Sequence, residues 1–229
     1  MTTLTQLIAI VRAALGDDNE LAPMFPDDQI TTWINHALGE ISQMFPDHSV
    51  MEWTTVAGQR RYEIEQFFFA MLSVEYPYAA DADPPQYLKR RSYTHRKFWL
   101  EPGYYDIIQR SWTDETYVNE LLISSTPLDD ETIRAEITLP HNALADGGDV
   151  STLPDVYNNL ICLYCHWNAW KDTITYIGRH ENPGLVDVSR EVNATRAEKQ
   201  FRNAMEEARK AQTESRSVQW QMDKWDQVY

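Results

Sequence analysis

Hydrophobic residues near the N-terminus recur at the spacing of an α-helix. The first such stripe consists of Leu4, Leu7, Ile8, Val11 and Leu15. Gly16 follows this stripe and predicts the end of the helix. A second stripe consists of Ile30, Trp33, Ile34, Ala37, Leu38 and Ile41. Asp27 and Asp28 precede it and favour a helix start through the helix dipole. Each helix has a single polar face, so we expect an antiparallel pair that packs on a further partner.

Between residues 51 and 139 the hydrophobic period changes to two, which is typical of β-strands. The clearest strand covers residues 133–139, where apolar and polar side chains alternate. Further predicted strands cover residues 51–55, 61–64, 70–76, 106–112 and 117–123. Helices do not alternate with these strands, so a doubly wound fold is disfavoured. We expect an antiparallel sheet, either a β-sandwich or an open barrel.

Helical patterning returns at Pro154. The apolar stripe that follows consists of Leu160, Leu163, Tyr164, Trp167, Trp170, Ile174 and Ile177. It ends at Asn182-Pro183-Gly184, and a last helix is predicted over residues 187–212. A polar hinge is predicted at residues 213–217, ahead of a short C-terminal tail.

The predicted fold class is therefore α+β. Residues 1–50 and 153–212 are expected to form a helical bundle, and residues 51–152 a β-rich domain. Residues 213–229 are expected to form a docking tail.

The net charge of the chain disfavours some classes of function. The chain has 229 residues, with 20 Lys and Arg against 35 Asp and Glu, which gives a net charge of −15. Nucleic-acid affinity comes from neutralising phosphates with cations, so sequence-specific binding is disfavoured. Passage of DNA as non-specific cargo is compatible with such a body. No apolar run reaches the ~18–20 residues of a membrane span, and the N-terminus lacks the basic leader of a signal peptide.

The segment Cys162-Leu-Tyr-Cys165-His166 matches the spacing of a haem-attachment box. The box lies within the apolar stripe of a predicted helix, where a free cysteine behaves as a small hydrophobe. Two cysteines, three residues apart, provide neither a disulfide framework nor a four-ligand zinc site. We therefore expect core packing, no cofactor and folding in the host cytoplasm. A haem- or metal-binding redox protein is the remote alternative.

Other candidate chemistry is weak. No GxSxG, HExxH, P-loop or GxGxxG pattern occurs, so an enzyme is not expected. The acidic pairs at 17–18, 27–28 and 129–130 lack the spacing and the glycine of a calcium loop. We interpret them as solvated turns and helix starts.

One basic stretch stands out in this acidic chain. Its cations are Lys89, Arg90, Arg91, Arg96 and Lys97. Aromatic residues interleave with them, a composition that by itself suggests nucleic-acid or phosphate contact. The net negative charge favours a different interpretation, in which the stretch meets an acidic patch on a neighbouring subunit or partner.

The C-terminal tail carries Trp220, Trp225 and Tyr229. A segment this short does not bury three large aromatic side chains by itself, and aromatic anchors dominate protein interfaces. Docking on a partner is the favoured interpretation, and folding back on the chain's own helices is the alternative.

A series of short motifs carries a family resemblance. L-x-x-L-I-x-x-V-R-x-x-L-G-D begins at Leu4, and F-P-D-D-x-I-x-x-W-I-N-x-A-L-x-E-I begins at Phe25. G-x-x-x-Y-x-I follows at Gly58, and a strand ends at Leu139-Pro140. L-P-x-x-Y-x-x-L begins at Leu153. This succession resembles the head–tail adaptor (connector) proteins of tailed bacteriophages over most of residues 3–175.

The resemblance implies a structural virion protein at the head–tail interface. Such proteins form a ring, commonly of twelve copies, which binds beneath the portal and extends the DNA ejection channel. The ring also provides the surface to which tail or nozzle proteins attach. The helical part would pack between subunits, the β part would project toward the tail, and a terminal segment would reach the portal. Another neck protein, such as a tail-completion (stopper) protein, is the alternative.

Overall fold

The computed structural model describes residues 1–17, 24–81, 84–112, 116–180 and 188–226, with side chains described for 1–17, 24–81, 84–109, 118–173 and 191–213. The chain divides into two compact units. Met1–Asp47 and Pro140–Tyr229 form the first, which we call the helical unit. His48–Leu139 forms the second, which we call the β unit. The mixed α+β class predicted from the sequence is confirmed.

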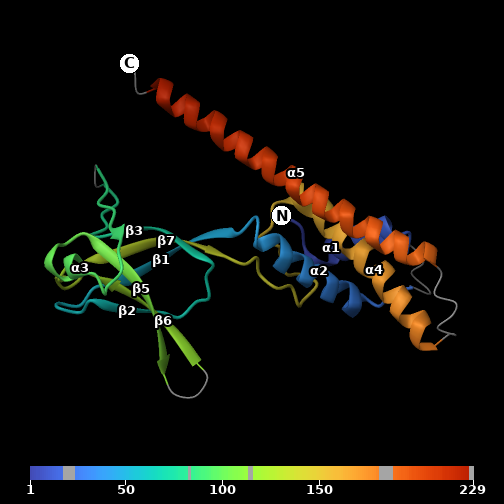
Figure 1. Cartoon of the computed structure of the whole chain (residues 1–229), viewed down its shortest axis with the longest axis horizontal. Coiled ribbons are helices and arrows are strands. Elements are labelled where there is room, and N and C mark those ends of the chain that lie inside the picture. Colours follow the sequence, from blue (N-terminus) through green and yellow to red (C-terminus); the bar gives the residue numbers. More distant parts are fainter. Residues whose placement is uncertain (18–23, 82–83, 113–115, 181–187, 227–229) are drawn as a thin grey trace. The chain divides into compact units, whose positions relative to one another are not determined.

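In the part of the helical unit that the structure describes, there are four α-helices (Figure 1). They are α1 (Leu4–Leu15), α2 (Asp27–Ser42), α4 (Asn158–His180) and α5 (Val188–Asp226), with a short 3-10 helix η1 (Asp155–Tyr157) ahead of α4. Thr3 caps α1 in a capping box with Gln6. Gly16 ends α1 at φ 69°, a left-handed conformation that favours glycine. The predicted start of α2 at Asp27 is also confirmed.

All four helices contribute to one hydrophobic core. Leu7, Val11, Ile30 and Ile34 are almost fully buried, as their predicted stripes require. The N-terminal pair finds its further partner in α4 and α5, at the opposite end of the chain. Phe201 of α5 lies 5.3 Å from the ring of Tyr164 on α4. The helical unit therefore forms only when both ends of the chain come together.

Within its described residues, the β unit contains seven strands and one short helix. The strands are β1 (Asp47–Thr54), β2 (Arg61–Ile64), β3 (Ala70–Glu75), β4 (Lys89–Arg90), β5 (Tyr104–Trp112), β6 (Thr116–Ile123) and β7 (Thr132–Leu139), and the helix is α3 (Arg96–Leu100). They form a three-stranded sheet, β1-β7-β3, and a four-stranded sheet, β2-β6-β5-β4. The pairs β2–β6, β3–β7 and β5–β6 are antiparallel, whereas β4 pairs with β5 in parallel.

Buried side chains from both sheets form one core. Val74, Ile133 and Ile137 come from the three-stranded sheet, and Ile64 and Leu121 from the four-stranded sheet. The two sheets thus pack as an open sandwich rather than as a closed barrel.

The C-terminal helix differs from the expectation. The hinge predicted at residues 213–217 is wrong, because α5 runs as one helix through this segment to Asp226. The segment contains no Gly or Pro that would end a helix, and its polar residues are compatible with a solvated helix surface. At 39 residues α5 is about 58 Å long, against about 35 Å for the 23 residues of α4.

Candidate interaction surfaces

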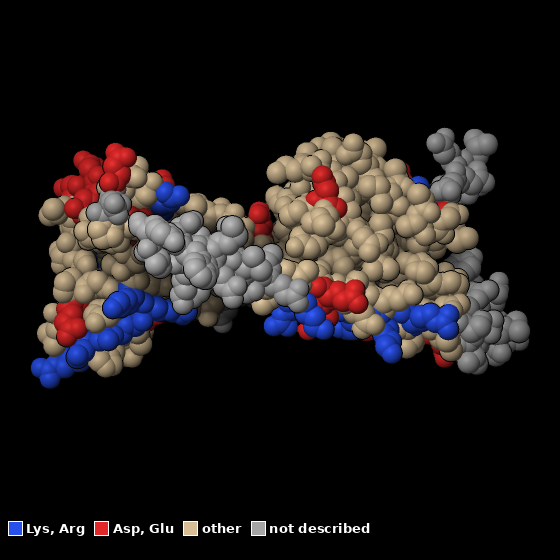
Figure 2. All heavy atoms as spheres, turned by 90° about the horizontal axis from the view of Figure 1, so that it is seen from above, with Lys and Arg blue, Asp and Glu red and all other residues tan. Residues whose placement is uncertain are grey.

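The basic stretch forms a surface on the β unit, which we call the cationic surface and define by Lys89, Arg90, Arg91, Arg96 and Lys97. Lys89 and Arg90 lie on β4, the edge strand of the four-stranded sheet. Arg96 and Lys97 open helix α3, and the ring of His95 caps it by accepting a hydrogen bond from the Lys97 amide. Figure 2 shows Lys and Arg gathered in a stripe along one side of the β unit.

Buried neighbours hold this surface in place. Leu88 is buried next to β4, and Phe98 is fully buried in α3. The aromatic residues between the cations face outward, with Trp99 47% and Tyr93 39% exposed. The indole of Trp99 donates a 2.7 Å hydrogen bond to the Tyr93 carbonyl, which fixes its orientation. The surface therefore combines exposed cations with oriented aromatic rings.

The five cations are not equivalent. The guanidinium of Arg91 lies 4.0 Å above the ring of Tyr104, in a cation–π contact that partly buries it. The Lys97 ammonium lies 3.7 Å from the carboxylate of Glu101, the C-cap residue of α3. Burial raises the pKa of Tyr105, while the positive charge of Arg90 opposes this shift. Lys89, Arg90 and Arg96 are exposed and are the residues best placed to meet an acidic partner.

The predicted docking aromatics belong to the other unit. Trp220 and Trp225 lie on α5, in the part of the helix for which only the backbone is described. Tyr229 lies outside the described residues. The structure thus places the five cations on or beside β4 and α3 of the β unit, and the two tryptophans on one helix of the helical unit.

The cysteine box lies in the core of the helical unit. Cys165 is fully buried there, and burial raises the pKa of its thiol. The imidazole of His166 accepts a 3.0 Å hydrogen bond from the indole of Trp170, one turn along α4. Within the described ranges, no three His, Cys, Asp or Glu side chains lie close enough to hold a metal ion. Cys165 packs as the predicted small hydrophobe.

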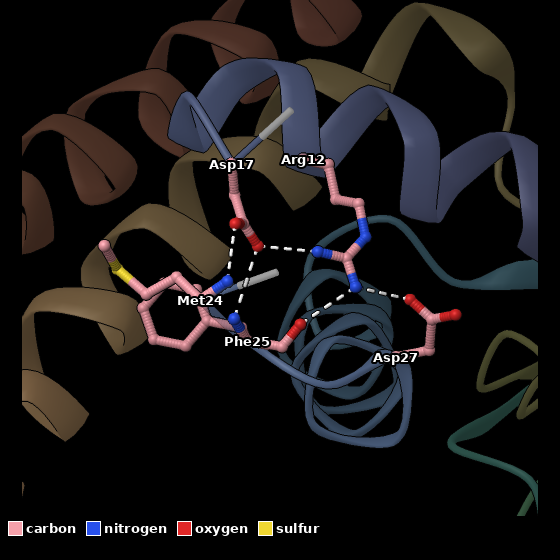
Figure 3. A network of polar contacts seen from close by, with 5 residues as sticks. All are labelled: Arg12, Asp17, Met24, Phe25 and Asp27. Carbon is pink, nitrogen blue, oxygen red and sulfur yellow. Dashed lines mark hydrogen bonds and ion pairs between the residues drawn. The ribbon is translucent and has the colours of Figure 1, made fainter. Parts of the chain in front are cut away.

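A polar network between α1 and α2 was missed by the sequence interpretation (Figure 3). Arg12 contacts Asp17 and Asp27 at 2.6 Å each and donates a 2.8 Å hydrogen bond to the Phe25 carbonyl. Asp17 also accepts hydrogen bonds from the amides of Met24 and Phe25. Its interpretation as part of a solvated turn is wrong, because the residue is only 8% exposed. The network ties the end of α1 to the start of α2.

A family model for the SU10 adaptor protein matches residues 2–223. The chain belongs to the SU10 adaptor protein family. Membership confirms the resemblance to phage head–tail adaptors and places the protein among structural adaptor proteins of the bacteriophage virion.

The family match also extends the resemblance. The short motifs cover residues 3–175, whereas the SU10 adaptor model continues to residue 223 and so includes most of α5. A search for similar curated proteins found no match. Among the described helices of this adaptor, none is both long and apolar enough to cross a membrane.

Proposed function

We propose that this adaptor forms a ring, of twelve copies, that binds beneath the portal at the head–tail interface. The ring extends the DNA ejection channel and provides the surface to which tail or nozzle proteins attach. The family match over residues 2–223 carries this proposal, because it includes both units and most of the C-terminal helix.

The cationic surface supports contacts between copies. A closed ring uses heterologous contacts, in which one surface of each copy meets a different surface of the next. Lys89, Arg90 and Arg96 form an exposed basic patch on a chain with a net charge of −15. Every neighbouring copy therefore offers acidic side chains to it, and complementary charge favours this pairing over association between like surfaces.

The C-terminal part of α5 is the proposed portal-docking element. It carries Trp220 and Trp225, and Tyr229 follows it in the sequence. Aromatic side chains contribute strongly to protein interfaces. The length of α5 supports this role, since the helix is longer than α4 by 16 residues (39 − 23).

The acidic composition suits a passage for DNA. Phosphates are held by Lys and Arg, so a body with 35 acidic and 20 basic residues binds the passing duplex weakly. DNA is thus cargo rather than ligand in this proposal, and no membrane contact is involved.

Removal of residues 218–229 tests the docking role. Binding to isolated portal rings should fall strongly, while the unfolding transition stays unchanged and the circular dichroism loses only the signal of the removed helical turns. Unchanged assembly on portal rings would overturn the docking assignment. Native mass spectrometry of the assembled complex should give twelve copies. A hexamer or a stable monomer would instead favour another neck or stopper protein.

A further inference from the structure

Small and apolar residues follow one face of α5 at alternating spacings of three and four. They are Ala197, Phe201, Ala204, Ala208, Ala211, Ser215, Val218, Met222 and Trp225. This is the heptad spacing by which two helices pack side by side, and Ser215 is its single polar member. We call the part formed by Val218, Met222 and Trp225 the distal seam.

The first half of this face is covered by the protein itself. Ala197 is 2% exposed and Phe201 4%. Ala204 and Ala208 are half-buried against the same core, and Ala211 is exposed. Burial of this face thus decreases from Ala197 to Ala211.

The cause of this decrease is the position at which α4 begins. Helices α4 and α5 run side by side, and Figure 1 shows them in opposite directions. Tyr157 at the end of η1 and Leu160 in the first turn of α4 line a shallow groove together with Ala208 and Ala211. Beyond Ala211 α5 continues for 15 residues, from 212 to 226, or about 22 Å. The heptad spacing persists there and its residues become larger.

We propose that the distal seam binds one amphipathic helix of the portal protein by heptad packing. This inference rests on the proposed function and specifies how the docking element recognises its partner. A helix is the partner that a heptad face fits, and an extended peptide has no matching periodicity.

The residues that flank the distal seam indicate the charge of the partner. The flanking positions hold Glu214, Gln219, Gln221 and Asp226, and none of them is basic. The basic residues of this segment, Arg216 and Lys224, occupy outer positions of the heptad. The partner helix should therefore carry Lys or Arg on either side of its apolar residues.

A second copy of the chain fits this face less well. Two identical seams that pack on each other form a closed two-fold contact, which does not propagate around a ring. In a parallel pair of α5 helices, Glu214 would meet Gln219 and Gln221 would meet Asp226. Neither pair places opposite charges together, so self-pairing gains no electrostatic attraction.

The seam assigns different roles to the two tryptophans. Trp220 lies five residues before Trp225, which is about 140° around the helix. Trp225 occupies the distal seam, whereas Trp220 occupies an outer position. The distal seam thus narrows the proposed docking anchors to Trp225 and removes Trp220 from them, so Trp220→Ala is a matched control for Trp225→Ala in the same helix.

Binding of full-length variants to isolated portal rings tests the inference. Trp225→Ala should weaken binding by about tenfold or more, and Trp220→Ala by less than about threefold. An equal loss of portal binding for both variants, or a larger loss for Trp220→Ala, would overturn the proposed packing through the distal seam. If removal of residues 218–229 has no effect, the proposed docking itself fails. If the removal weakens portal binding strongly but Trp220→Ala and Trp225→Ala weaken it equally, only the proposed packing through the distal seam is refuted.

A charge variant provides a second test. Asp226→Lys changes a flanking position and Asp223→Lys an outer one, with the same change of charge. Asp226→Lys should weaken portal binding by about threefold, an effect that high salt removes, and Asp223→Lys should not. Equal losses of portal binding for the two variants would contradict the prediction that basic residues flank the apolar face of the partner helix. A seam variant that alters only self-association of the adaptor would assign the seam to a second copy and overturn the proposal.

Discussion

The helical unit and the β unit are built from different parts of the chain. The β unit is one continuous segment, His48–Leu139, whose strands are mostly joined by short connections. The helical unit combines both ends of the chain, and its polar contacts span long separations, such as Gln29 with Asp172 and Asn35 with Leu144. The helical unit therefore closes over nearly the whole chain, whereas the β unit closes within one segment, where β2 pairs with β6 and β3 with β7.

Each unit carries a different type of interaction surface. On the β unit, exposed side chains stand directly beside buried anchors in the same short element. On the helical unit, α5 packs into the core through Ala197 and Phe201 and then continues past the start of α4. A rigid surface suits contacts that repeat around a ring, and an extended helix suits contact with a separate protein.

The largest effect is expected at the anchor of the cationic surface. Phe98→Ala removes a fully buried side chain and should lower the free energy of unfolding by about 3–5 kcal/mol. Trp99→Ala, at the adjacent position, should lower it by only about 1 kcal/mol, because this half-exposed side chain loses one hydrogen bond and one ring contact. Chemical denaturation measures both. A comparable loss for Trp99→Ala would mean that the fold, rather than a partner, uses the tryptophan.

The ion pairs of the two units should differ in strength. Asp17 is buried with Arg12 and accepts two backbone amides, so Asp17→Ala should cost about 3 kcal/mol. Lys97 and Glu101 are both exposed, and Lys97→Ala should cost at most about 1 kcal/mol. Urea midpoints of the two variants provide the measurement. Similar costs would contradict the role of the Arg12 network in joining α1 to α2.

The two units should respond to pH in opposite directions. Burial lowers the pKa of His141 in the helical unit. As the pH falls, this imidazole is therefore protonated in the unfolded chain before it is protonated in the folded one. Stability of this unit should fall as pH drops below about 6.5. Burial raises the pKa of Tyr62 and Tyr76 in the β unit, with Glu131 adding to the shift at Tyr76. These tyrosines stay neutral in the folded state, so β-unit stability should fall above about pH 10.

Hydrogen exchange read by mass spectrometry follows the two units separately. Acidification should increase exchange in the helical unit first, and His141→Gln should reduce this acid sensitivity. The β unit should show its increase at alkaline pH. Loss of protection in both units at the same pH would remove the predicted contrast.

The smallest effect on folding is expected from the exposed cations. Arg90→Glu together with Arg96→Glu should change the free energy of unfolding by less than about 0.5 kcal/mol. The same double variant should weaken assembly between copies, because it replaces the basic patch with an acidic one. Native mass spectrometry at increasing ionic strength measures this loss. Intact rings with wild-type salt dependence would show that the patch has another role.

The sequence was sufficient to predict a helix or strand where a hydrophobic period extends over several helical turns or a full strand. It predicted the helix end at Gly16 and the helix start at Asp27, and it located all the longer strands. Strand β4 and helix α3 were not predicted, because two and five residues are too few to establish a period.

Other features depend on contacts that no local pattern contains. Asp17 is buried because Arg12 and two amides from beyond the turn converge on it. The predicted hinge relied on polar composition alone, although polar residues also form the exposed side of a long helix. Cys165 was correctly predicted to be a core residue, because its position within the apolar stripe was given more weight than the spacing of the haem-attachment box.

Cryo-electron microscopy of the full-length protein bound to its portal is the most direct test of the central claim. The account predicts a twelve-copy ring beneath the portal, with Lys89, Arg90 and Arg96 at contacts between copies. It also predicts that α5 of each copy packs on one portal helix through Val218, Met222 and Trp225. A monomer or hexamer, or a ring whose α5 helices do not touch the portal, would contradict it.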